Sequence, residues 1–125
     1  MYFHVWFSTK YRKCLLCGEI EKLILDSFEE CIARHGYRVL ELAANRDHVH
    51  VLLEVCDRKE LAGAVRTLKA VSARQVLCLP DLRKRNFKHF WARRYGWNAI
   101  PEPRIETVRA YIRAQGNVLY KKGVV

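Results

Sequence analysis

Residues 37–55 read YRVLELAANRDHVHVLLEV, and this stretch decides the fold. Two runs rich in apolar and β-branched residues, Tyr37 to Ala44 and His48 to Val55, are each long enough for a strand. The three residues between them, at positions 45–47, are typical of a tight turn. We therefore expect the two runs to form an antiparallel β-hairpin.

The segments on both sides of the hairpin extend it into a series of strands and helices. Apolar residues alternate in the predicted strands and repeat every three or four positions in the predicted helices. Besides the hairpin we expect a strand over Tyr2 to Ser8, a helix over Glu19 to His35, a helix over Lys59 to Leu79, a strand over Lys88 to Trp97 and a helix over Ile105 to Tyr120. The order β-α-β-β-α-β plus a C-terminal helix predicts an α+β, ferredoxin-like (RRM-like) antiparallel sheet in one domain over residues 1–125.

The charge balance is strongly basic. The chain has 23 Lys and Arg residues against 13 Asp and Glu, which gives a formal net charge of +10. Such a surface attracts polyanions, and nucleic acid is the commonest of these. The sequence contains no apolar run of the roughly 18 residues that a membrane span needs, and its N-terminus lacks the layout of a signal peptide. We expect a cytoplasmic protein that does not associate with membranes.

The five cysteines are odd in number and scattered along the chain. This pattern indicates a reducing compartment rather than a disulfide framework. Cys14 and Cys17 form a C-x-x-C pair, but no second pair at zinc-finger spacing accompanies it. A structural zinc is therefore not expected.

His48 and His50 are two residues apart in a predicted strand, so both imidazoles leave the same face of the sheet. Val49, Val51 and Leu53 face the other way, toward a core. Two adjacent imidazoles are costly to bury unless something uses their nitrogens. A divalent metal is one user. Hydrogen bonds to backbone or water are the other, and the two residues alone leave both open.

Tyr111 and Gln115 lie four residues apart in the last predicted helix and share one of its faces. Taken alone, such a pair is more often a packing tyrosine and a surface amide.

Four segments of the chain together resemble the single-tyrosine transposases of bacterial insertion sequences, a branch of the HUH endonucleases. They are FHVWFSTKYR at residues 3–12, DHVHVLL at 47–53, FW at 90–91 and VRAYIRAQ at 108–115. They occur in the family's order and span nearly the whole chain, and REP-associated tyrosine transposases share the same pattern. The chain departs from it at Arg94, where family members commonly have a glycine.

The resemblance implies a role for each matching residue. His48 and His50 would be metal ligands, Gln115 would complete the coordination of Mg²⁺ or Mn²⁺, and Tyr111 on the C-terminal helix would be the nucleophile. The implied activity is cleavage and rejoining of single-stranded DNA at insertion-sequence ends through a 5′-phosphotyrosine intermediate. The implied substrates are hairpins formed by imperfect palindromes.

Basic residues near these segments are candidate contacts for DNA phosphates. They are Lys10, Arg12, Lys13, Arg83, Lys84, Arg85, Lys88, Arg93, Arg94, Lys121 and Lys122. Trp91, Tyr95 and Trp97 are candidates for stacking on unpaired bases, although each aromatic residue is more often part of a core.

Two other functions remain open at this stage. One is a non-catalytic RRM-like module that binds nucleic acid, although it would need paired aromatic residues where this chain has His48 and His50. The other is a metal-dependent hydrolase in which Tyr111 is merely structural. Only the transposase predicts a covalent protein–DNA adduct.

An open four-stranded sheet has two edges that can pair with another chain. We therefore expect a homodimer, which the resemblance also implies. The link from Asn98 to Arg104 reaches roughly 23 Å when fully extended, which would let the Tyr111 helix cross to the partner's histidines.

Overall fold

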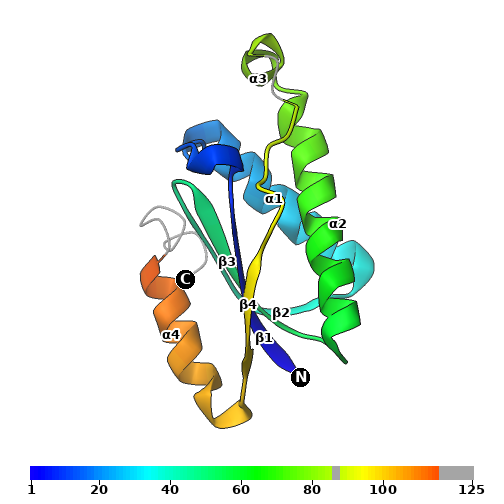
Figure 1. Ribbon diagram of the computed structural model, residues 1–125, viewed down its shortest axis with the longest axis vertical. Coiled ribbons are helices and arrows are strands. Elements are labelled where there is room, and N and C mark those ends of the chain that lie inside the picture. The colour runs from blue at the N-terminus through cyan, green and yellow to red at the C-terminus, as the bar shows by residue number, and fades with distance from the viewer. Residues whose placement is uncertain (86–87, 116–125) are drawn as a thin grey trace.

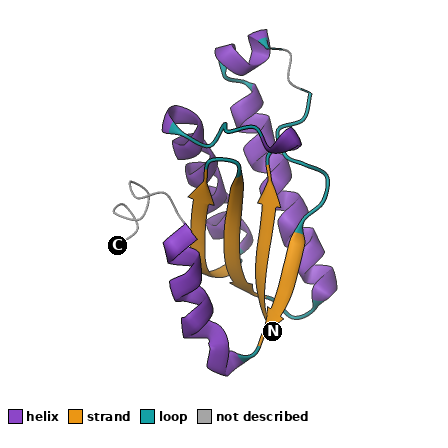
Figure 2. Ribbon diagram, turned by 60° about the vertical axis from the view of Figure 1, so that its left-hand side comes forward, coloured by secondary structure: helices purple, strands orange, loops and turns teal. Residues whose placement is uncertain are grey.

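The computed structural model describes residues 1–85 and 88–115, and its centre is a four-stranded antiparallel sheet (Figure 1). The strands lie in the order β2-β3-β1-β4, side by side in Figure 2. Their bounds are β1 (Tyr2–Ser8), β2 (Arg38–Asn45), β3 (His48–Glu54) and β4 (Gly96–Ile100). The helices are α1 (Gly18–His35), α2 (Arg58–Leu77), α3 (Pro80–Lys84) and α4 (Ile105–Gln115), with short 3-10 turns η1 (Lys10–Arg12) and η2 (Glu102–Arg104). This confirms the ferredoxin-like α+β prediction.

Helices α1 and α2 cover one face of the sheet and enclose the main apolar core (Figure 1). Alternation along the strands fills this core, because Phe3, Val5 and Phe7 of β1 point to the same side as Val49 and Val51 of β3. Gly36 ends α1 with a left-handed φ of 69°, the conformation that a C-terminal glycine adopts without strain. The predicted hairpin and both long helices are thus confirmed.

Helix α4 lies on the opposite face of the sheet, against β2 and β3. Its apolar anchor is small and consists of Ile105 and Ile112 packed on Ala43 and Leu52. Burial of these few side chains holds α4 against the sheet.

The predicted fourth strand was wrong in its bounds, because β4 begins at Gly96 rather than near Lys88. In the earlier part of that segment only Trp91 forms a bridge, to Thr9. The aromatic residues that suggested a strand instead fill the core, where Trp91 packs on Phe7 and donates from Nε1 to Ser72 Oγ at 2.9 Å. A stacking role for Trp91 on DNA bases is therefore excluded.

Two further boundaries differ from the prediction. Helix α2 stops at Leu77, and Pro80 begins α3, since proline is favoured in the first turn of a helix. Residues 98–100 belong to β4, so the free link before α4 is much shorter than seven residues. The end of the last predicted helix, at 116–120, lies outside the described residues, as do Lys121 and Lys122.

Gly96 sits opposite Trp6 in the β1–β4 ladder. A Cβ atom at Gly96 would overlap the indole of Trp6, so glycine is needed for the two strands to pair with the indole in place. Within residues 1–85 and 88–115, no helix has both the length and the apolar character for crossing a membrane.

Candidate active site

One cavity of about 350 Å³ brings together the four residues predicted to form the site. His48 and His50 enter it from β3, and Tyr111 and Gln115 enter it from α4. The Tyr111 side chain is 51% exposed, and its ring centroid lies 6.1 Å from that of His50. A tyrosine exposed to this extent, beside two imidazoles, is accessible to a ligand in the cavity.

His48 is oriented by the residue before it. Its Nδ1 lies 2.6 Å from Asp47 Oδ1, and the other oxygen of Asp47 accepts from Arg12 Nε at 3.2 Å. The hydrogen bond to His48, assisted by Arg12, lowers the pKa of Asp47. The carboxylate therefore stays ionised and holds Nδ1 of His48 as a donor, so Nε2 is the nitrogen of this ring that could ligate a cation.

His50 is buried, and its neighbour is a third histidine. Its Nδ1 lies 2.9 Å from His4 Nε2. Burial, assisted by the nearby His4 and His48, lowers the pKa of His50 to about 4, so the ring is neutral at neutral pH. Its Nε2 is buried and has no hydrogen-bond partner. A buried imidazole nitrogen without a partner is unfavourable unless a cation or another ligand uses it.

This donor set fits a divalent ion with open coordination positions. Among the described residues no cluster of three or more His, Cys, Asp or Glu side chains is arranged to hold a metal. A metal here would therefore rest on the imidazoles of His48 and His50 and the side-chain oxygen of Gln115, and the remaining positions would be left to substrate and water.

Helix α4 is fixed to the sheet by two ion pairs that share one buried carboxylate, as well as by its apolar anchor. Glu41 of β2 has a side chain only 6% exposed, and its two oxygens accept from Arg109 Nε at 3.2 Å and Arg113 Nε at 3.1 Å. These arginines lie two residues before and two residues after Tyr111. The two ion pairs with Glu41 therefore help to fix the position of Tyr111 relative to the cavity.

The candidate DNA contacts divide into two groups. Arg12, Arg94 and Tyr95 line the cavity, with Lys10, Lys13 and Arg93 close to them in sequence. Tyr11 and Arg12 adopt left-handed backbone conformations, with φ of 59° and 52°, a strained turn of the kind often found at functional sites.

The second group lies apart from the cavity. Arg83, Lys84 and Arg85 lie on or just after α3, which projects beyond the end of α2 (Figure 1), and Arg85 pairs with Asp81. Trp97 packs on Phe3 on the core side of the sheet, beneath the Arg58 guanidinium. These residues do not line the cavity.

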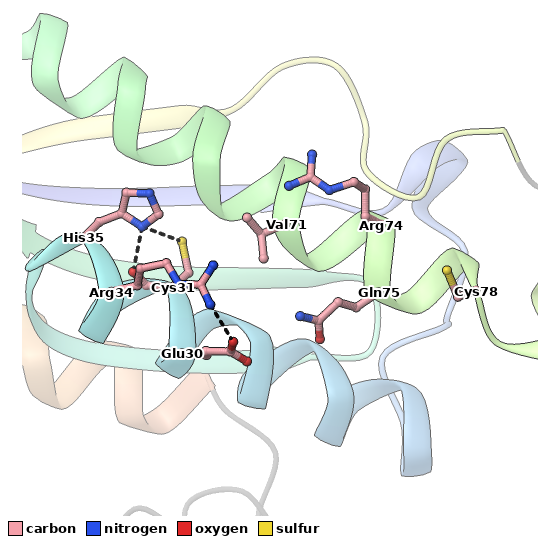
Figure 3. A pocket seen from close by; sticks show the side chains of 8 residues that line it. All are labelled: Glu30, Cys31, Arg34, His35, Val71, Arg74, Gln75 and Cys78. Carbon is pink, nitrogen blue, oxygen red and sulfur yellow. Dashed lines mark hydrogen bonds and ion pairs between the residues drawn. The ribbon is translucent and has the colours of Figure 1, made fainter.

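A second cavity, of about 390 Å³, lies between α1 and α2 on the other side of the sheet (Figure 3). Its polar groups bond to one another, with Arg34 on Glu30 and His35 Nδ1 on the backbone oxygen of Cys31. Burial raises the pKa of the Cys31 thiol, which makes it a poor nucleophile.

Sequence reasoning missed His4 and Glu41 as parts of the site. His4 was visible in the quoted β1 segment, where it alternates with the core residues Phe3 and Val5 and shares a face with Trp6. Nothing in the sequence around Glu41 indicated that it belongs to the site.

Comparison with known proteins identifies the family of this chain. Residues 1–115 match the family model described as "Transposase IS200 like", and the chain belongs to this family. The protein is thus a transposase of the single-tyrosine type, and its activity is DNA transposition.

Curated relatives support this assignment. The ISDra2 transposase TnpA of Deinococcus radiodurans is 27% identical over 115 residues, which cover 90% of this chain and 82% of that protein. The IS200 transposase of Salmonella typhimurium is 27% identical over 95 residues, which cover 74% of this chain and 62% of that protein.

Two solved structures share the fold. A crystal structure from Deinococcus radiodurans R1, assigned there as a candidate transposase, aligns with a TM-score of 0.71 at 24% identity and covers 94% of this chain and 92% of that one. A REP-associated tyrosine transposase bound to a REP hairpin aligns with a TM-score of 0.66 at 13% identity and covers 90% and 64%.

Proposed function

We propose that this transposase cleaves and rejoins single-stranded DNA, with Tyr111 as the nucleophile and a divalent ion held by His48, His50 and Gln115. The observation that carries the proposal is the shared cavity, in which an exposed tyrosine lies with two histidine side chains, one of which has a buried nitrogen lacking a hydrogen-bond partner. The proposed place of action is the cytoplasm, where bacterial insertion sequences reside.

The proposed reaction is a transesterification. The Tyr111 oxygen attacks the scissile phosphorus, the bond from phosphorus to the 3′ oxygen breaks, and the phenolic proton ends on that oxygen as a free 3′-OH. The enzyme then carries a 5′-phosphotyrosine. Attack by another 3′-OH reverses these steps and returns the proton to Tyr111, so the strand is rejoined without ATP.

The groups around the cavity would each support this reaction in a different way. A bound Mg²⁺ or Mn²⁺ would polarise the phosphate and stabilise charge on the leaving oxygen. Asp47 keeps His48 oriented, and Glu41 fixes the helix that carries Tyr111. Arg12 and Arg94, which line the cavity, attract the DNA backbone.

The proposed substrate is DNA that folds into hairpins at element ends. The support is the fold shared with a REP-associated transposase that was solved on a REP hairpin, together with the basic cavity rim. Unpaired strands suit the site because a phosphate in single-stranded DNA can reach a recessed cavity.

We also propose that the protein acts as a homodimer, since β2 and β4 are the outer strands of the sheet and, within residues 1–85 and 88–115, neither has a further strand beside it. Within one chain α4 already packs on its own sheet, so sharing of sites between subunits would require α4 to leave it. Sedimentation tests the dimer. Mixing inactive Tyr111→Phe and His48→Ala proteins tests the sharing, because only shared sites restore cleavage.

A base-reading RRM-like module is disfavoured, because α4 covers the sheet face that such modules use. A hydrolase with a structural Tyr111 is disfavoured too, since the side chain is half exposed rather than packed.

Covalent trapping tests the proposed function. Labelled single strands from DNA flanking the gene are incubated with protein and Mn²⁺, and adducts are separated on a denaturing gel. We expect an adduct with wild type and none with Tyr111→Phe or with chelator, while DNA binding is retained. The matched control is Tyr11→Phe, at an exposed tyrosine that does not line the cavity, which should form the adduct normally. An adduct with Tyr111→Phe would overturn the assignment.

A further inference from the structure

The two cavity histidines share one arrangement, in which each Nδ1 is hydrogen-bonded by a neighbouring side chain. His48 Nδ1 has the Asp47 carboxylate at 2.6 Å, and His50 Nδ1 has the His4 imidazole at 2.9 Å. The first partner is an anion that can only accept. The second is a ring that can donate or accept, so the proton of that hydrogen bond can belong to either His4 or His50.

Two placements are possible between neutral imidazoles. If His4 donated from Nε2, the proton of His50 would sit on its own Nε2, which is buried and has no acceptor. An imidazole nitrogen that carries a proton also cannot ligate a cation. If instead His50 donates from Nδ1, its Nε2 carries a lone pair, and an unused lone pair in the cavity wall is what a cation would take up.

We propose that His4 is a positioning residue, which accepts the Nδ1 proton of His50 and thereby keeps His50 in the tautomer whose Nε2 can bind a divalent cation. This inference rests on the metal in the proposed function. It adds a role for His4, and the position of the proton on His50 can be measured without the metal.

The surroundings of His4 suit this role. It lies on the central strand β1, where its backbone pairs with Leu52 on one side and Asn98 on the other. The side chain is 8% exposed, and its ring lies 5.0 Å from that of Trp6 and 6.0 Å from that of Tyr111. Because Trp6 and Tyr111 pack on the ring of His4, it has few orientations in which Nε2 would point away from His50.

A neutral partner for His50 also makes electrostatic sense. Asp47 already supplies one negative charge beside His48. A second, buried carboxylate beside His50 would be costly to desolvate and would repel the DNA phosphate that has to enter. An imidazole supplies an acceptor without adding charge.

The direct test is the tautomer of His50 in the metal-free wild-type protein. Two-bond ¹H–¹⁵N correlation spectra distinguish a proton on Nδ1 from one on Nε2. We expect the Nδ1–H form. The Nε2–H form would overturn the proposal, and this measurement requires neither a variant nor activity.

The second test compares variants by Mn²⁺ affinity, measured by titration calorimetry without DNA. His4→Leu removes the acceptor and should weaken binding by about 10–100-fold, the usual effect of losing a residue that orients a ligand. His4→Gln places an amide oxygen in reach and should bind nearly as tightly as wild type. His35→Leu, in the cavity on the other side of the sheet, is the matched control and should bind normally.

The outcomes separate the two proposals. If His4→Leu binds Mn²⁺ like wild type while His48→Ala and His50→Ala do not bind it, the role of His4 is wrong and the metal site stands. If wild type binds no more Mn²⁺ than His48→Ala, the proposed metal itself fails.

Discussion

The two faces of the sheet are built from the same strands, yet they differ in kind. The α1 and α2 face is an extensive apolar cluster in which aromatic rings such as Phe7, Phe28 and Trp91 pack against one another. The α4 face has four buried apolar residues and, beside them, buried His4, His50 and Glu41. Apolar packing is concentrated on one face and the polar residues of the candidate site lie on the other, because alternation along a strand lets a single sequence serve both.

This difference predicts that substitutions which remove packing contacts have different effects on unfolding at the two faces. Loss of packing under α1 and α2 should unfold the whole protein, whereas loss of contacts under α4 should release one helix.

The largest effect is expected at Phe28, which is fully buried against Phe7 and Trp91. Phe28→Ala should lower the free energy of unfolding by about 3–5 kcal/mol, a large part of the roughly 5–15 kcal/mol of a typical domain. Urea denaturation followed by circular dichroism measures it. The matched variant is Ile112→Ala, equally buried but on α4, which should cost less globally and speed hydrogen exchange in α4. Equal global losses would mean that the two faces unfold as one unit.

An intermediate effect is expected at Glu41. Glu41→Ala removes the acceptor of both arginines, which can then turn to solvent because Arg113 is already half exposed. Docking of α4 should weaken by about 1.5–3 kcal/mol, the range for hydrogen bonds to charged groups. Adduct formation should fall, while the urea midpoint changes little. Glu41→Gln keeps one acceptor and should lie between alanine and wild type. Unchanged adduct yield with Glu41→Ala would show that the apolar anchor alone positions Tyr111.

The smallest effect is expected at the basic turn beside the cavity. Replacing Lys10, Arg12 and Lys13 with glutamine should reduce the slope of log affinity against log salt by about 0.7 for each lost phosphate contact on single strands. Fluorescence anisotropy over a salt series measures the slope. The same change at Arg83, Lys84 and Arg85 on the α3 side is the matched comparison and should alter the slope less. The reverse ranking would place the DNA across α3.

Much of the fold was predictable, because alternation and helical spacing are local properties. The order of elements, the shared face of His48 and His50 and the shared face of Tyr111 and Gln115 were all readable in this way. The start of β4 was not, since aromatic residues suit a strand and a core equally well, and Trp91 is used in the core.

The contacts to His4 and Glu41 were not predictable because they depend on register. His4 is paired with Leu52, and it reaches His50 only diagonally across the ladder, a relation that no single strand encodes. Strict alternation would place Glu41 with Val39 on the core side. A register shift between these two residues turns Glu41 toward α4, where it meets arginines 68 and 72 positions further along the chain.

The contact between Gly96 and Trp6 restricts which substitutions this protein can accept during evolution. A side chain at position 96 would collide with the indole unless the indole moved, so a mutation there should cost least in a lineage that has already lost the tryptophan. Loss of the tryptophan first is the permitted order, because it leaves a gap rather than a collision. The two positions, 90 residues apart, should therefore be inherited as a pair, with substitutions at 6 preceding those at 96 in descent.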